Sequence, residues 1–197
     1  MERTRPIFLN AVFVTALAIP TLVGFAQNTS NSVPYKVLKT AKVGGEGGYD
    51  YIFADVKARR LYIPRGGQAG RLTVFNLDTM ESVGTIADVS AGGATVDPES
   101  SHGFSTTKPI TMWDARTLKV IKTIEVDGHP DGILTDPFNE RVWVLSHQPP
   151  HATIIDAKSG TVVKTLDLGG APEQAVSDGK GTIYVNIADK ANIAVVD

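Results

Sequence analysis

Short apolar runs alternate with polar turns along most of the chain, and this pattern recurs at a nearly fixed interval. In each repeat one apolar run ends on an aspartate and the next run carries an aromatic residue. The aspartates lie 42, 39 and 42 residues apart. They are Asp55, Asp97, Asp136 and Asp178, and the aromatic residues are Tyr62, Phe104, Trp143 and Tyr184. Self-similarity at this period indicates a repeat architecture.

Each repeat contains four apolar runs rich in Val, Ile, Thr and aromatic residues and bounded by Gly, Pro, Asp or Asn, which are signals of β-strands joined by turns. The fourth run carries an element such as Lys122-Thr123-Ile124, and Lys39-Thr40 looks like an earlier copy of it. The third run closes on Asn76, Asp114, Asp156 or Asp197. This order predicts sixteen strands. No segment of 11 or more residues beyond the N-terminal apolar stretch keeps a helical period, so helices should be scarce.

Four antiparallel strands in about 41 residues is the period of one β-propeller blade. We therefore predict an all-β fold, a β-propeller of four-stranded antiparallel blades with about four blade-equivalents. The alternative is a β-sandwich, but sandwiches do not repeat at a fixed internal phase. The predicted repeats cover residues 36–197, with blade boundaries near residues 58, 100, 139 and 180.

The N-terminal segment has the pattern of a secretory signal. Arg3 and Arg5 precede an apolar run over residues 7–25, and small residues at Gly24 and Ala26 form a cleavage site. We predict a signal peptide over residues 1–26 and a flexible lead-in over residues 27–35, which implies a periplasmic or secreted protein. The alternative is an uncleaved membrane anchor, because an apolar run of this length is just sufficient to span a bilayer.

Composition excludes several classes of protein. The chain of 197 residues has no cysteine, which excludes a disulfide scaffold and a cysteine-ligated metal site. Its formal net charge is −2, and no stripe of Lys and Arg interleaves with aromatic residues, so nucleic-acid binding is not expected.

Several segments resemble repeats of the YVTN-type (YncE-like) β-propeller family. They are Tyr184-Val185-Asn186, Asp114-Ala115-Arg116-Thr117, Asp156-Ala157-Lys158-Ser159-Gly160, the glycine-rich segment 44–51 and the segments 169–173 and 178–181. The resemblance implies an exported propeller, from a family whose members mostly have no assigned activity. Those members usually have about seven blades, so the resemblance also implies that this chain is an incomplete propeller, roughly half of a longer one.

Three repeats place a carboxylate at the same position, five residues before the repeated aspartate. The four equivalent residues are Asp50, Gly92, Asp131 and Glu173. In a propeller this position lies at the mouth of the central channel, where converging carboxylates would attract a cation or an amine. His129 lies close to this ring in the sequence and is a further candidate ligand-binding residue. The alternative is that each acid caps its own turn or faces solvent.

Other residues have more ordinary explanations. His147 and His151 have a metal-like spacing, but Pro149-Pro150 prevents the helix that usually aligns such a pair, so only weak metal binding is conceivable. The glycines of segment 44–48 suit a tight turn better than a phosphate cradle, because no helix start follows them. We expect the repeated aspartates to hold their turns and the repeated aromatic residues to pack between blades.

The leading functional hypothesis is an exported, non-enzymatic propeller that binds a small molecule or a protein at its channel face. The alternative is an enzyme of lactonase-like or quinoprotein-like type, in which Asp50, Asp131 and Glu173 would bind a metal. The sequence assigns no catalytic residue, no metal ligand and no cofactor. Calcium-dependent lactone hydrolysis would distinguish the enzyme from the binding protein.

Overall fold

The computed structural model describes residues 35–197, which contain fifteen β-strands, one short 3-10 helix and no α-helix. The signal peptide predicted over residues 1–26 and all of the lead-in except Tyr35 lie outside these residues. Within the described part of the chain, no helix is long and apolar enough to cross a membrane. The compact unit formed by residues 41–197 contains every strand.

The strands form four antiparallel sheets, each built from strands that are consecutive in the chain. The first sheet contains β1 (Phe53–Asp55), β2 (Arg60–Arg65), β3 (Arg71–Asn76) and β4 (Ser82–Ala87), and the second contains β5 (Ala94–Val96), β6 (His102–Ser105), β7 (Ile110–Asp114) and β8 (Val120–Ile124). The third sheet contains β9 (Pro130–Asp136), β10 (Arg141–Ser146), β11 (Ala152–Asp156) and β12 (Val162–Leu166). The fourth contains β13 (Pro172–Ser177), β14 (Ile183–Ile187) and β15 (Asn192–Val196), with the 3-10 helix η1 (Ala188–Lys190) between the last two strands.

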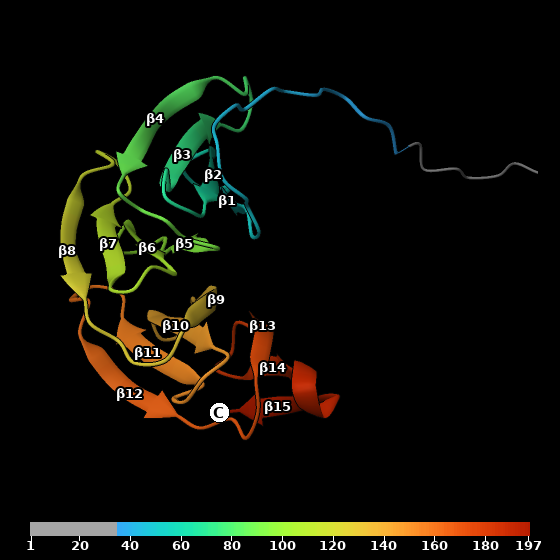
Figure 1. Cartoon of the computed structure of the whole chain (residues 1–197), viewed down its shortest axis with the longest axis vertical. Helices are drawn as coiled ribbons and strands as arrows, with labels where there is room; N and C mark the ends of the chain where they lie inside the picture. The colour runs from blue at the N-terminus through green and yellow to red at the C-terminus, as the bar shows by residue number, and fades with distance from the viewer. Residues whose placement is uncertain (1–34) are drawn as a thin grey trace, which may run out of the picture. The chain divides into compact units, whose positions relative to one another are not determined.

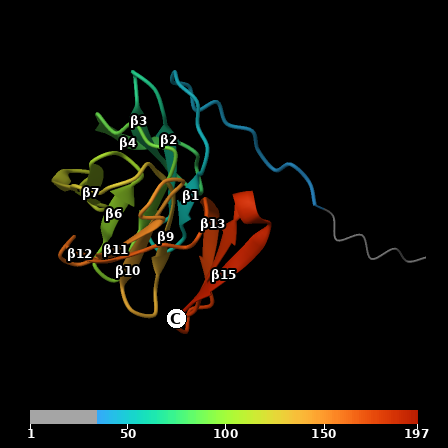
Figure 2. The same cartoon turned by 60° about the horizontal axis from the view of Figure 1, so that its bottom comes forward.

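Within this unit the sheets follow one another around an arc, with β1, β5, β9 and β13 on the inner side and β4, β8 and β12 on the outer side (Figure 1). The inner strands of successive sheets contact one another, and the turned view shows β13 beside β9 (Figure 2). These are the blades of a β-propeller, three with four strands and one with three. The predicted fold class is therefore confirmed.

Side chains from facing sheets form three apolar clusters, one between each pair of neighbouring blades. Tyr62 and Trp113 pack between the first and second sheets, Phe104 and Val142 between the second and third, and Leu145 and Val185 between the third and fourth. In the two middle sheets the central strands β6, β7, β10 and β11 are almost entirely buried, because a neighbouring blade covers each face. The core of the molecule lies between the blades.

The predicted role of the aromatic residues holds in three of the four repeats. Tyr62, Phe104 and Trp143 are buried against the next blade, but 41% of Tyr184 is exposed. Tyr184 is exposed because no fifth sheet follows β13–β15 within the described residues.

Two other expectations about the strands are wrong. Lys39-Thr40 does not form a strand, and the neighbouring Val37 and Leu38 are both 84% exposed. The strand before each repeated aspartate is hydrogen-bonded to the strand after it, so both belong to the same blade. One blade therefore ends and the next begins in segments 88–93, 125–129 and 167–171. The boundaries predicted near residues 58, 100, 139 and 180 instead lie in the turns between the first two strands of each blade.

The repeated aspartates hold the turns that follow them, as predicted. Asp55 accepts a hydrogen bond from the amide of Ala58 at 2.9 Å, Asp97 from that of Ser100 at 2.7 Å and Asp178 from that of Lys180 at 2.7 Å. Asp136 also accepts one from the Ser177 hydroxyl of the next blade, at 2.7 Å. These bonds fix the turns locally, and this local role accounts for the recurrence of the aspartates.

The aspartates that end the third strands make stability sensitive to acid. Hydrogen bonds from the backbone and hydroxyl of Ser159 lower the pKa of Asp156, and Arg141 lowers it further. Since this folded-state pKa lies below the unfolded value of about 3.9, its contribution is complete above that pH and is lost as pH falls through the folded-state pKa.

We expect Asp156→Asn to flatten the dependence of stability on pH, because asparagine keeps an acceptor oxygen but does not titrate. The measurement is the urea midpoint of the wild type and the variant between pH 3 and pH 7. Equal losses of stability on acidification in the two proteins would contradict this expectation.

Candidate functional site

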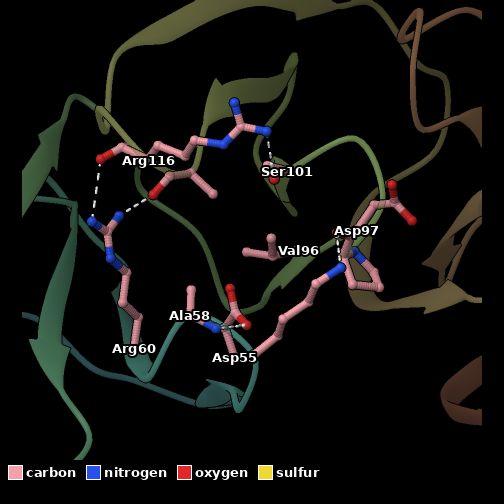
Figure 3. A pocket seen from close by; sticks show the side chains of 10 residues that line it. Asp55, Ala58, Arg60, Val96, Asp97, Ser101 and Arg116 are labelled. Atoms are coloured by element: carbon pink, nitrogen blue, oxygen red, sulfur yellow. Dashed lines mark hydrogen bonds between the residues drawn. The ribbon is translucent and has the colours of Figure 1, made fainter.

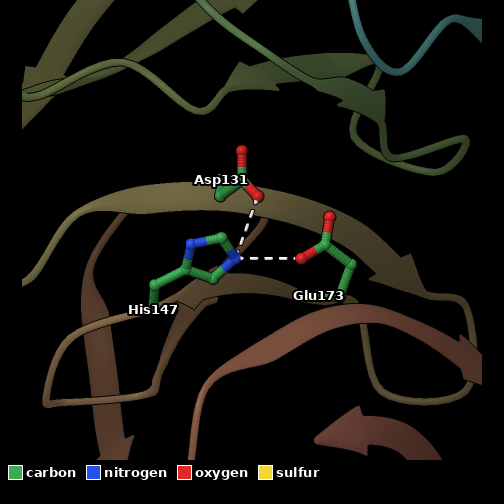
Figure 4. A group of neighbouring side chains, drawn as sticks. All are labelled: Asp131, His147 and Glu173. Carbon is green, nitrogen blue, oxygen red and sulfur yellow. Dashed lines mark hydrogen bonds and ion pairs between the residues drawn. The ribbon is translucent and has the colours of Figure 1, made fainter. Parts of the chain in front are cut away.

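Asp131, His147 and Glu173 meet at one end of the inner strands. Asp131 and Glu173 are the second residues of β9 and β13, and His147 begins the loop between β10 and β11. His147 Nε2 lies 3.3 Å from Asp131 Oδ2 and 3.1 Å from Glu173 Oε2. Figure 4 shows the three side chains pointing toward one another. The structure thus brings together two of the residues predicted from the repeat, Asp131 and Glu173, and adds a histidine.

Asp50 and Gly92 complete the predicted ring of equivalent positions. A Cβ atom placed on Gly92 would lie 3.4 Å from Asp131 Oδ1 and 4.0 Å from Asp50 Cβ, so Asp131 and Asp50 flank the same glycine. The charges of Asp50 and Glu173 both act on Asp131. The three carboxylates therefore gather at one mouth of the inner strands, as their rotational equivalence predicts.

Tyr51 connects the first blade to this site. Its hydroxyl donates a hydrogen bond to Glu173 Oε1 at 2.9 Å, and its amide donates one to the carbonyl of Gly92 at 3.0 Å. Burial, the hydrogen bond to Glu173 and the charge of Asp131 raise the pKa of Tyr51, so its hydroxyl stays protonated and acts as a donor. Glu173 Oε1 is thereby engaged by Tyr51, while Oε2 faces His147.

The side chain of Asp131 is the most buried of the three. It is 22% exposed, whereas the side chain of Glu173 is 43% exposed and that of His147 is 44% exposed. Burial raises the pKa of Asp131, and the nearby charges of Glu173 and Asp50 raise it further, while His147 acts in the opposite direction. Concentrated negative charge of this kind favours a cation. The exposed edges of Glu173 and His147 leave the cluster accessible from solvent.

Ser146 fixes the loop that carries His147. Its side chain is buried, and its hydroxyl accepts hydrogen bonds from the amides of His129 at 2.7 Å and Gln148 at 3.1 Å. The same hydroxyl donates to the carbonyl of Gln148 at 2.6 Å. The position of the His147 backbone is therefore set by the fold.

The other predicted histidines lie outside the cluster. His129 is exposed, and only its amide takes part in the contacts around Ser146. His151 is buried and its Nδ1 lies 2.6 Å from Asp167 Oδ1, so it does not act as a pair with His147.

Tyr51 is a site residue that the sequence did not assign, and His147 was considered there only for weak metal binding together with His151. The strand order contained information about the position of His147, because the loop after β10 opens on the same side of the blade as the start of β9. The only indication for Tyr51 in the sequence was its position next to Asp50.

Two cavities accompany the inner strands. One of about 410 Å³ is lined by residues of β1, β5, β9 and β13, including Thr95, Ile133 and Gln174. The other, of about 300 Å³, lies between the first two blades and is lined by Asp55, Arg60 and Arg116 (Figure 3). At the edge of the second cavity Arg60 donates hydrogen bonds to the carbonyls of Ala115 and Arg116. Arg116 in turn donates a hydrogen bond to Ser101 Oγ at 3.0 Å. The Arg60 guanidinium thus joins the first two blades, whereas that of Arg116 bonds within the second blade.

No family model matches the sequence, and no curated protein is significantly similar to it. Among solved structures, the fold is similar to "Kuenenia stuttgartiensis Hydrazine Synthase", with a TM-score of 0.66 and 18% identity over 82% of this chain and 48% of that one. It is also similar to "Structure of U3-55K", with a TM-score of 0.56 and 11% identity over 73% of this chain and 50% of that one. The chain thus spans about half the length of these structures. At these identities the likeness supports the propeller fold of the chain.

Proposed function

We propose that the chain is an exported, non-enzymatic propeller that binds a small cationic ligand at the mouth formed by Asp50, Asp131 and Glu173. The observation that carries the proposal is the convergence of Asp131 and Glu173 on His147 from neighbouring blades, with Asp50 close enough for its charge to act on Asp131. Export is supported by the N-terminal sequence and by the resemblance to YVTN-type repeats.

The charge balance at the mouth favours a cationic ligand. In the described part of the chain, the salt bridges of lysine and arginine involve other acids, and Asp131 and Glu173 are paired with His147 alone. One histidine cannot neutralise three carboxylates, even when it is protonated. A metal cation or a protonated amine would supply the remaining positive charge.

The proposal is tested by calorimetric titration of the full chain with spermidine, Ca²⁺ and Zn²⁺. We expect the wild type to bind at least one of them saturably at one site. The double variant Asp131→Asn, Glu173→Gln should weaken this binding by at least about tenfold, since it removes two charged contacts.

The matched control is Glu81→Gln, Glu99→Gln, which removes the same charge from two exposed residues in the turns after β3 and β5, at the strand ends opposite the mouth. It should bind like the wild type. Identical weak binding by all three proteins would refute the proposed function.

A further inference from the structure

We infer that the cation is a divalent transition metal of the Zn²⁺ type, held by Asp131 Oδ2, His147 Nε2 and Glu173 Oε2. This inference rests on the proposed function and specifies its ligand. One ligand atom from each of these residues lies within 4.8 Å of those of the other two, and the residues come from two neighbouring blades.

The distances from the imidazole nitrogen fit one metal ion. Zinc binds histidine nitrogen at about 2.0–2.1 Å and carboxylate oxygen at about 2.0–2.2 Å, so two ligands of a tetrahedral site lie about 3.3–3.5 Å apart. His147 Nε2 lies 3.3 Å and 3.1 Å from the two carboxylate oxygens. Both distances approach those between ligands of a shared ion, and the carboxylate oxygens of Asp131 and Glu173, which lie within 4.8 Å of one another, would move closer together on binding.

The direction of the contacts also favours a metal. Nε2 can carry only one proton, yet it faces carboxylate oxygens of two different residues. When the neutral imidazole carries its proton on Nδ1, the lone pair of Nε2 points toward both oxygens and can bind a cation between them; when Nε2 carries the proton, it donates that proton to these oxygens instead. A metal ion at this point would accept all three ligands at once.

The types of ligand atom select among cations. Ca²⁺ and Mg²⁺ are bound by oxygen, whereas imidazole nitrogen suits Zn²⁺ and other first-row transition metals. Three protein ligands leave one tetrahedral position for water or for a donor atom of a second ligand. The exposure of His147 and Glu173 keeps that position open to solvent.

A hydrogen bond from Tyr51 already holds one of the ligands in place. Tyr51 donates to Glu173 Oε1 and leaves Oε2 directed at His147. A hydrogen bond to the other oxygen of a carboxylate is how proteins commonly orient a metal ligand. Because Tyr51 belongs to the first blade and Glu173 to the fourth, this bond would make metal binding depend on the packing of all four blades.

The test is a titration of the full, untagged chain with Zn²⁺, with Co²⁺ as a spectroscopic probe and with Ca²⁺ and spermidine as comparisons. We expect Zn²⁺ to bind most tightly at a 1:1 ratio, and Co²⁺ to give the visible absorption of a tetrahedral site. His147→Gln should weaken Zn²⁺ binding by more than about 10- to 100-fold, the range that second-shell substitutions alone produce. The same variant should bind Ca²⁺ or spermidine nearly as well as the wild type, which also shows that it is folded.

His129→Gln is the comparison within the same mouth, and it should bind Zn²⁺ nearly like the wild type, because His129 acts on Asp131 through its charge but is not one of the three ligands. If Zn²⁺ binds no more tightly than Ca²⁺, or if His147→Gln leaves Zn²⁺ binding unchanged, the metal assignment is wrong. Loss of spermidine or Ca²⁺ binding in Asp131→Asn, Glu173→Gln would still support the proposed function in that case. Absence of binding by any of these cations would refute both.

Discussion

Trp113→Ala is expected to lower the free energy of unfolding by about 3–5 kcal/mol, the range observed when a large buried aromatic side chain is removed. Trp113 is completely buried between the first and second blades. Its ring lies 6.0 Å from that of Tyr62, centroid to centroid, and it packs directly over Gly103, where no side chain intervenes. The expected loss therefore comes chiefly from packing.

The measurement is the urea denaturation of the full chain at neutral pH. Trp113→Phe should lose less stability, because part of the ring remains. Val163→Ala, at an exposed position of the outer strand β12, should change stability by no more than about 0.5 kcal/mol. If Trp113→Ala were no more destabilising than Val163→Ala, the contact between the first two blades would not be a main source of stability.

The blade pattern was predictable from the sequence because it depends on local features. Alternation of apolar residues, turn residues at fixed offsets and an aspartate that holds its own turn are all set within a few residues, as at Asp97 and Ser100. These local features do not determine which segments hydrogen-bond to one another as strands. The element at Lys39-Thr40 has the composition of a fourth strand but does not form one, so composition alone does not decide which segment joins a sheet.

Part of the candidate site was predictable because two of its residues follow the repeat pattern. Asp131 and Glu173 occupy equivalent positions in successive repeats, and rotation about a common channel brings such positions together. His147 lies in a loop whose course is set by contacts such as those of Ser146, and these do not recur from blade to blade. Tyr51 reaches Glu173 across 122 residues of sequence, a distance over which neither periodicity nor spacing gives a signal.

Gly132→Ala is expected to lower both stability and cation binding, because this glycine sets how closely two blades approach at the site. Gly132 is buried between Asp131 and Ile133 on β9. A Cβ atom there would lie 2.5 Å from the backbone carbonyl oxygen of Glu173 and 3.2 Å from Leu145 Cδ1. A backbone atom of a paired strand cannot rotate away, so β9 and β13 must separate.

Overpacking of this kind costs about 1–3 kcal/mol. Separation of the two strands would also carry Asp131 away from Glu173, and a displacement of a few tenths of an ångström is large beside ligand distances that must hold within about 0.2 Å. We therefore expect Gly132→Ala to weaken Zn²⁺ binding by at least about tenfold under conditions where the variant is still folded. Urea denaturation and calorimetric titration of the same sample measure the two effects together.

Gly48→Ala is the matched control, because a Cβ atom at Gly48 would meet nothing within 4 Å and its φ lies outside the left-handed region. It should retain both stability and binding. Loss of stability in Gly132→Ala with unchanged Zn²⁺ affinity would show that the site tolerates movement between β9 and β13. Loss of both properties would show that the close packing of these two blades is what holds the carboxylates of Asp131 and Glu173 at a separation that one metal ion can bridge.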